Sequence, residues 1–102
     1  MYKLEFLPIA KKDIEDIVQY ISHNLKNPIA AKKLSNNFIV ATNSILEFPY
    51  GYPIYNLFEN LKNEYRSIKV KNFLMFYTID EEKKTITIAR ILYQKMSIDV
   101  FL

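Results

Sequence analysis

Six residues in the C-terminal half of the chain have the chemistry to bind phosphate groups or an acidic partner. Five are cations and one is a tyrosine: Arg66, Lys69, Lys71, Arg90, Tyr93 and Lys95. Arginine and lysine bind phosphate through charge and hydrogen bonds. Cleavage of RNA would also need a base for the 2′-hydroxyl and an acid for the leaving oxygen. No convincing acid–base pair accompanies these cations, so they indicate a binding surface more than a catalytic centre.

Other kinds of catalytic site are not indicated by the sequence. The chain has no glycine-rich phosphate loop, no cluster of metal ligands and no cysteine. Its one histidine, His23, falls near the end of a predicted helix, where a surface position is far more common than a catalytic one. We therefore expect no metal and no cofactor, and we assign no catalytic residue.

Length and composition restrict the class of protein. A chain of 102 residues, half of them hydrophobic and only one of them glycine, is long enough for one domain and too short for two. We therefore expect a single domain over residues 1–102. No cysteine, no signal-like start and no membrane-length apolar run are present, which predicts a cytoplasmic protein without a membrane partner.

The net charge of +3 is unevenly distributed. Residues 1–60 hold six lysines and six acids, whereas residues 61–102 hold eight lysines or arginines and five acids. The whole surplus therefore lies in the C-terminal part of the chain. Such a surplus suits nucleic acid or an acidic protein partner, and it suits an ordinary lysine-rich surface equally well.

Three consecutive strands must position the cations. Apolar and polar residues alternate over 64–71, 73–79 and 84–92, which is the pattern of half-buried strands. The dipeptide Lys71-Asn72 and the charged run 80–84 are short connections of the kind found in hairpins. The sequence therefore predicts an antiparallel meander of three strands.

Two arginines interrupt the apolar pattern of this meander. Arg66 and Arg90 each have the same parity as apolar residues of their strand, so both would point towards the covered face of the sheet or lie at its open end. A buried guanidinium must be paired, and Asp13 and Asp16 are plausible partners. Either the arginines tie the sheet to a helix, or they face a ligand.

Two helices precede the meander. Apolar residues recur at helical spacing over 9–25 and 28–47. Asn27-Pro28 combines an N-cap with proline at the first helical position, and Pro49 ends the second helix. A short strand is predicted at 2–7. Because few residues separate the helices, we expect an antiparallel helical hairpin that covers one face of the sheet.

A series of residues along nearly the whole chain matches the pattern of a known family. They are Ala10, Asp13-Ile14, Ile17, Tyr20-Ile21, Pro28, Ala31, Phe48-Pro49, Gly51, Tyr65-Arg66, Ile68, Val70, Asn72-Phe73, Phe76-Tyr77, Ile88 and Arg90-Ile91-Leu92. In this order and spacing the chain resembles the ParE-type toxins of the RelE/ParE superfamily, the toxic half of bacterial type II toxin–antitoxin modules. The resemblance implies an α+β fold of the order β-α-α-β-β-β, with the helical hairpin packed on an antiparallel sheet.

The resemblance also implies a partner and a function. Members of the superfamily are neutralised by a cognate antitoxin; RelE-like members cut messenger RNA on the ribosome, and ParE-like members are associated with poisoning DNA gyrase. Leu74 and Met75 stand where RNA-cutting relatives would have an arginine, and Tyr93 stands where many ParE-like relatives have histidine. The tail, 96–102, has neither tyrosine nor histidine. We favour a gyrase-directed toxin without catalysis of its own. A ribosome-dependent mRNA endonuclease and a non-toxic antitoxin-binding member are the alternatives.

Antitoxin binding would need apolar surface outside the two-helix layer. The apolar residues exceed what this layer can bury, and the candidates for exposure have the opposite parity on their strands or lie in the tail: Leu74, Phe76, Ile91, Tyr93 and Phe101. A helix or strand of the antitoxin would bury them, with its acids meeting Lys69, Lys71 and Lys95. Without the antitoxin, the same surface predicts self-association, for example as a homodimer.

Overall fold

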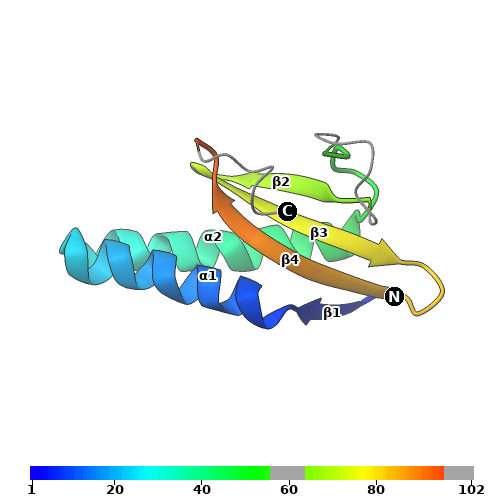
Figure 1. Ribbon diagram of the computed structural model, residues 1–102, viewed down its shortest axis with the longest axis horizontal. Coiled ribbons are helices and arrows are strands. Elements are labelled where there is room, and N and C mark those ends of the chain that lie inside the picture. The colour runs from blue at the N-terminus through cyan, green and yellow to red at the C-terminus, as the bar shows by residue number, and fades with distance from the viewer. Residues whose placement is uncertain (56–63, 96–102) are drawn as a thin grey trace.

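A computed structural model describes residues 1–55 and 64–95 of the chain (Figure 1). The elements are β1 (Lys3–Phe6), α1 (Pro8–Gln19), a π-helical turn η1 (Tyr20–Asn24), α2 (Pro28–Glu47), β2 (Arg66–Val70), β3 (Phe73–Asp80) and β4 (Thr85–Tyr93). The predicted order is confirmed. Each predicted boundary lies within two residues of the observed one when α1 and η1 are taken together.

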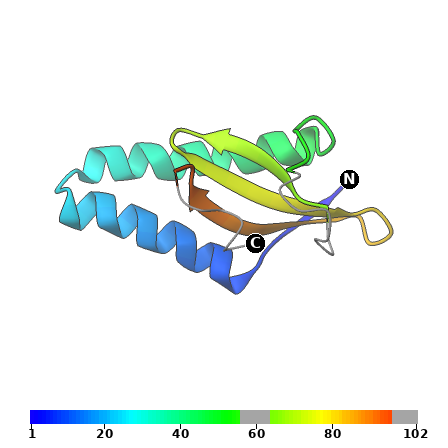
Figure 2. The ribbon, with the colours of Figure 1, turned by 45° about the horizontal axis from the view of Figure 1, so that its top comes forward.

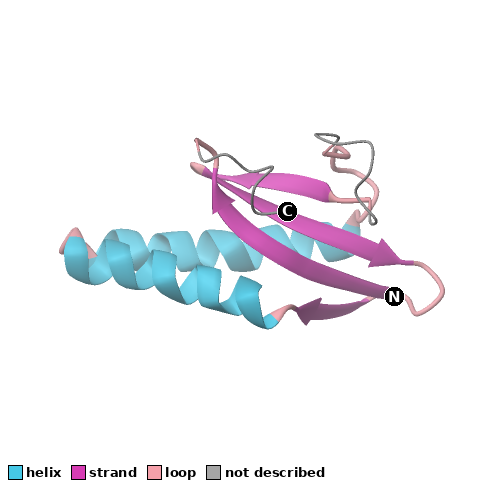
Figure 3. Cartoon of the chain, in the orientation of Figure 1, coloured by secondary structure: helices cyan, strands magenta, loops and turns pink. Residues whose placement is uncertain are grey.

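The fold has two layers, with the helical hairpin on one face of a four-stranded sheet (Figure 3). The strand order is β1–β4–β3–β2, and β2, β3 and β4 form the predicted antiparallel meander. β1 instead runs parallel to β4, with Lys3 opposite Thr85 and Phe6 opposite Ile88. The sheet is therefore mixed rather than wholly antiparallel. The connection through the two helices brings the chain back so that it can run again in the same direction as β1.

The two helices begin as their sequences predict. The side chain of Asn27 accepts a hydrogen bond from the backbone N–H of Ala30 at 3.1 Å, with Pro28 at the start of α2. α1 starts with Pro8 and has no side-chain cap. Lys26, between the helices, adopts a φ of 52°. The cap at Asn27 and the two prolines are thus local sequence signals for the starts of both helices.

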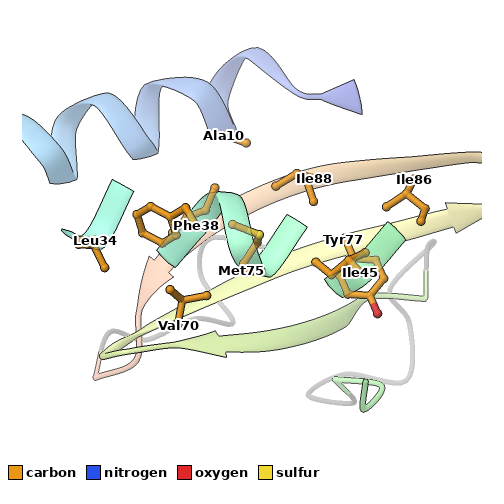
Figure 4. Packing of buried hydrophobic residues seen from close by; sticks show 11 residues of the cluster. Ala10, Leu34, Phe38, Ile45, Val70, Met75, Tyr77, Ile86 and Ile88 are labelled. Atoms are coloured by element: carbon orange, nitrogen blue, oxygen red, sulfur yellow. The ribbon is translucent and has the colours of Figure 1, made fainter. Parts of the chain in front are cut away.

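Apolar residues from both helices and from the facing side of the sheet form the main core (Figure 4). The buried residues labelled there are Ala10, Leu34, Phe38, Ile45, Val70, Met75, Tyr77, Ile86 and Ile88. Tyr77 donates its hydroxyl hydrogen bond to the carbonyl oxygen of Pro49 at 2.6 Å, and burial raises the pKa of Tyr77 to about 12. This bond fastens the segment after α2 to the core, because a buried hydroxyl needs a partner.

An extra residue in β4 changes which side chains face the helices. Phe76 pairs with Arg90, but the next residue of β3 pairs with Ile88, so Ala89 is left over on β4. Such a bulge inverts the alternation of the residues that follow it. Ile91 therefore lies in the main core and is 2% exposed.

Past the residues of β4 that pair with β1, helix α1 provides the hydrogen-bond acceptor for the edge of β4. Asp13 accepts hydrogen bonds from Nε and Nη2 of Arg90 at 2.8 and 3.0 Å, and from the backbone N–H of Ile91 at 3.0 Å. The side chains of Arg90 and Asp13 are 16% and 13% exposed. The predicted ion pair between the sheet and the first helix is therefore confirmed for Arg90.

Replacement of Asp13 by alanine should destabilise the fold strongly. The change removes the carboxylate that accepts from a mostly buried guanidinium and from a backbone N–H, and loss of one member of such a pair costs about 3 kcal/mol. Urea unfolding measures the free energy. Asp16→Ala is the matched control, because the Asp16–Lys12 pair is 60% and 70% exposed, and it should cost less than about 1 kcal/mol. Equal costs for the two variants would contradict a special role for Asp13.

Candidate functional site

Arg66 contacts backbone carbonyls and not a carboxylate of α1, so the predicted pairing with Asp13 or Asp16 is wrong for this arginine. Its Nη1 donates to the carbonyl oxygen of Tyr52 at 2.7 Å, and its guanidinium carbon lies 5.1 Å from the ring centroid of Tyr50. The physical reason is the strand order. β2 is the edge strand on the far side of the sheet from β1 and β4, whereas α1 lies against β4.

The other four target-binding candidates gather near one end of the sheet. Lys69, Lys71 and Lys95 are exposed, and the side chain of Tyr93 is 37% exposed. The β2–β3 turn meets the end of β4 there, since the N–H of Gln94 donates to the carbonyl oxygen of the turn residue Asn72 at 2.8 Å. The six candidates are thus divided. Arg66 and Arg90 make contacts within the chain, and four residues face outwards.

The apolar candidates for antitoxin binding are less exposed than expected. The expectation of exposure is wrong for Phe76, which is fully buried, and for Ile91, which the bulge places in the main core. Phe76 belongs to a second cluster with Leu92, against which Leu74, Tyr55 and Tyr65 pack. Leu74 is half-buried, and Phe101 lies outside the described residues. Antitoxin binding by these residues, and self-association without the antitoxin, stay predictions.

A cluster of polar side chains around one carboxylate, that of Glu81, lies at the β3–β4 turn. The sequence did not predict it. Glu81 accepts hydrogen bonds from the hydroxyls of Tyr50 and Tyr2 at 2.6 and 2.8 Å, and it forms an ion pair with Lys84. Lys84 and then the two tyrosines lower the pKa of Glu81 to about 2, and the bond to Glu81 raises the pKa of Tyr50 to about 12. A carboxylate held ionised in this way is a poor general base at neutral pH. The cluster joins three segments of the fold, those that carry Tyr2, Tyr50 and the β3–β4 turn.

Sequence reasoning missed this cluster because its members are far apart in the chain. Tyr50 is 31 residues from Glu81, and Tyr2 is 79 residues away. Contacts between residues so far apart in the chain leave no periodic pattern in the sequence. The charged run 80–84 indicated the turn but not its tyrosine partners.

Within residues 1–55 and 64–95, no group of three metal-ligating side chains comes together. The exposed His23 has its Nδ1 3.3 Å from the carbonyl oxygen of Gln19 on the preceding turn. Across the same described ranges, no helix is long and apolar enough to span a membrane.

Solved structures of known proteins share the fold of this chain. The chromosomal ParDE toxin–antitoxin system of P. aeruginosa aligns with a TM-score of 0.72 and 17% identity, covering 91% of this chain and 96% of that one. The archaeal RelE–RelB complex of Pyrococcus horikoshii OT3 aligns with a TM-score of 0.64 and 11% identity, covering 94% and 98%. The isolated E. coli RelE toxin gives 0.56 and 15%, covering 100% of both chains. The likeness shows a RelE/ParE-like fold.

The family is defined more closely by sequence. The family model of the ParE toxin of the type II toxin–antitoxin system, parDE, matches residues 4–98. The chain therefore belongs to the ParE toxin family and is a type II toxin of the ParE/RelE superfamily, whose members are paired with antitoxins. No curated protein sequence matches this chain.

Removal of the Arg66 side chain tests whether it is structural. Arg66→Leu takes the donor away from the carbonyl of Tyr52 in a site where the arginine is only 14% exposed. Loss of a hydrogen bond from a charged donor should cost about 2 kcal/mol in urea unfolding. Lys69→Leu, on the same strand and exposed, should change stability by less than about 0.5 kcal/mol. Full stability of Arg66→Leu with loss of toxicity would show instead that Arg66 faces the target.

The Glu81 cluster predicts a defined dependence of stability on pH. The pKa of Glu81 is lowered in the folded protein from 4.5 to about 2, so its contribution is complete above about pH 4.5 and is lost as the pH falls towards 2. Thermal unfolding across this range should show a smaller loss of stability in Glu81→Gln than in the wild type. Because Glu81 is half exposed, added salt should reduce the difference. Glu82→Gln is the control, and a pH profile of Glu81→Gln identical to wild type would contradict the assignment.

Proposed function

We propose that this toxin acts in the cytoplasm by binding DNA gyrase, that it is neutralised by a cognate antitoxin, and that it does not cleave RNA. Membership of the ParE family supports this reading, and the chemistry of the sheet carries it. The alternatives differ in what they require at the sheet, since a nuclease needs an acid, a base and free cations around one phosphate, whereas a gyrase-binding protein needs only a complementary surface.

The observation that carries the proposal is the apolar second face of the sheet. On β3 and β4 this face presents Phe76 and Leu92, both buried, with Leu74 beside them. The ring of Tyr55 covers Phe76 edge-on at a centroid distance of 5.0 Å. The side chains of Phe76, Leu92 and Leu74 neither transfer protons nor bind phosphate. The position at which an arginine would serve RNA cleavage is thus part of an apolar cluster.

The arginines of the strands are occupied by contacts within the chain. Arg90 is held by Asp13 in a bidentate pair, and Arg66 donates to the carbonyl of Tyr52. A guanidinium that already has its anionic or carbonyl partner has fewer donors left for a phosphate. This arrangement supports structural roles for both arginines and leaves target binding to other side chains.

The exposed residues at the end of the sheet form the proposed target-binding surface: Lys69, Lys71, Tyr93 and Lys95. Exposed cations steer association with a negatively charged partner and fix its orientation. Gyrase bound to DNA offers such a partner, because the DNA that it holds is polyanionic. The proposed mechanism is therefore binding without covalent chemistry on the toxin.

A gyrase assay tests the proposal directly. Toxin made by cell-free synthesis is added to gyrase and relaxed plasmid, and we expect inhibited supercoiling together with covalent gyrase–DNA complexes. Changing Lys69, Lys71 and Lys95 together to glutamine should weaken inhibition about tenfold or more, since several long-range charge contacts are lost. Changing Lys3, Lys11 and Lys83 together to glutamine removes the same charge at exposed sites elsewhere and should leave inhibition unchanged.

Two results would contradict the proposal. Fragmentation of translated messenger RNA with unaffected gyrase would indicate a ribosome-dependent endonuclease. Normal growth on expression without an antitoxin, together with normal supercoiling, would indicate a family member that only binds its antitoxin.

A further inference from the structure

The first strand leaves one edge of the sheet open. β1 is the terminal strand of the order β1–β4–β3–β2 and pairs with β4, and α1 leads away from the end of β1 in both views of the molecule (Figures 1 and 2). We propose that this edge binds the same edge of a second copy of the chain, so that the two sheets join into one continuous sheet. The order of residues along β1 carries the inference, because it is complementary to itself when two copies run antiparallel.

Backbone groups at alternate positions of β1 face the open edge. The N–H of Lys3 donates to the carbonyl oxygen of Lys84 at 2.7 Å, and the N–H of Leu7 donates to a carbonyl oxygen of β4 at 3.0 Å. Since successive residues of a strand direct their backbone groups to opposite sides, Leu4 and Phe6 direct theirs away from β4. No described residue outside β1 and β4 bonds to these groups. The edge therefore offers the donors and acceptors that a further strand uses.

One row of side chains along β1 is complementary to itself. Met1, Lys3, Glu5 and Leu7 share one parity and are exposed, and in order they are apolar, positive, negative and apolar. If two copies run antiparallel about Leu4, the lysine of each copy lies opposite the glutamate of the other, and the methionine lies opposite the leucine. Opposite charges directly across two strands stabilise the pair, and like charges destabilise it. Every position of the row therefore meets a suitable partner.

The other face of β1 contributes apolar side chains to the same contact. Tyr2, Leu4 and Phe6 pack against the main core and are only partly buried. In the antiparallel register, Leu4 meets its own equivalent, and Tyr2 meets Phe6 of the second copy. Side chains directly opposite on antiparallel strands point to the same face, so the helices of both copies lie on one side of the joined sheet. The contact thus extends the hydrophobic core together with the sheet.

The edge strand on the opposite side, β2, does not have this property. The segment before it already bonds to its start, since the N–H of Ser67 donates to the carbonyl oxygen of Pro53 at 3.1 Å. β2 carries Arg66 and Lys69 and no acid, so two antiparallel copies of β2 would bring cations together without a counter-charge. Of the two edge strands that the structure describes, β1 is therefore the one suited to a second copy of itself.

Charges on an edge strand often prevent pairing, but those of β1 have the opposite effect. A lone lysine, or two charges of one sign, repels a second copy of the strand. Lys3 and Glu5 differ in sign and are separated by one residue, so each strand neutralises the other. Ile9, in the first turn of α1, is 46% exposed and adds apolar surface next to the edge. Because the paired segment is short, we expect a reversible dimer and not an obligate one.

This edge is a different surface from the one around Leu74, for which self-association is also expected. That expectation concerns apolar side chains on the second face of the sheet, whereas pairing at β1 depends on backbone hydrogen bonds and on two opposite charges. The inference does not rest on the proposed function, because the lysines assigned to target binding lie on β2, in the β2–β3 turn and after β4.

Charge reversal tests the register. Sedimentation velocity of the whole chain should show a dimer that dissociates on dilution. Lys3→Glu and Glu5→Lys each place two like-charge pairs across the contact, so each should weaken the dimer about tenfold. An equal mixture of these two variants should dimerise again, because every reversed charge then meets its opposite. The doubly changed chain, Lys3→Glu with Glu5→Lys, should also dimerise.

Matched charge reversals elsewhere serve as controls. Lys33→Glu and Glu47→Lys change the same charges at exposed sites on α2, and dimerisation should be unchanged. Melting curves establish that each variant is folded. Equal weakening by the α2 variants and the β1 variants would contradict the assignment, as would a mixture of the two β1 variants that dimerises no better than either variant alone.

Hydrogen exchange identifies the edge itself. Raising the protein concentration should slow exchange of the Leu4 and Phe6 amides, whereas the Lys3 amide, which is bonded within one copy, should change little. A chain that stays monomeric, or a dimer in which the Leu4 and Phe6 amides exchange as fast as in dilute solution, would overturn the proposal. If these amides are slowed only when the paired antitoxin is added, the edge takes a strand of another protein and the proposal fails. A dimer without gyrase inhibition would refute only the proposed function.

Discussion

The contact between Asp13 and the end of β4 is the interaction on which the packing of the two layers depends. β1 covers only Thr85–Ile88 of β4, so the rest of that edge needs another partner. Asp13 supplies it by accepting from the Ile91 N–H and from Arg90. Apolar contacts between helix and sheet are non-directional, whereas a bidentate pair fixes position and orientation.

The sequence allowed the elements to be predicted better than their side-chain environments. Periodicity, Asn27-Pro28 and the two short connections were sufficient for the order and bounds of the helices and strands. They could not reveal the bulge, since nothing in the residues around Ala89 distinguishes it from regular alternation. Ile91 was therefore assigned to the wrong face, while the pair of Arg90 with Asp13 was anticipated. Arg66 and the parallel pairing of β1 depend on strand order, which local patterns do not encode.

The two ends of the molecule have different roles. At the β3–β4 turn, Glu81 accepts hydrogen bonds from two tyrosine hydroxyls and pairs with the ammonium group of Lys84. Polar contacts therefore hold the segments at that end together. The other end has an apolar groove and exposed lysines that form no ion pair with a described residue. Lys71 and Lys95, which belong to the proposed target-binding surface, are close in the chain to the groove residues Asn72 and Tyr93.

The parallel pairing of the first strand with the last has a consequence for synthesis on the ribosome. Asp13 meets Arg90, and Tyr2 meets Glu81, across 77 and 79 residues of chain. At cellular rates of translation, the time between the synthesis of the N-terminal strand and helix and the synthesis of these partners is on the order of 4–15 s. A nascent chain that has not yet released β4 has neither the ion pair nor the completed sheet. We therefore expect the sheet to be completed only after β4 has left the ribosome.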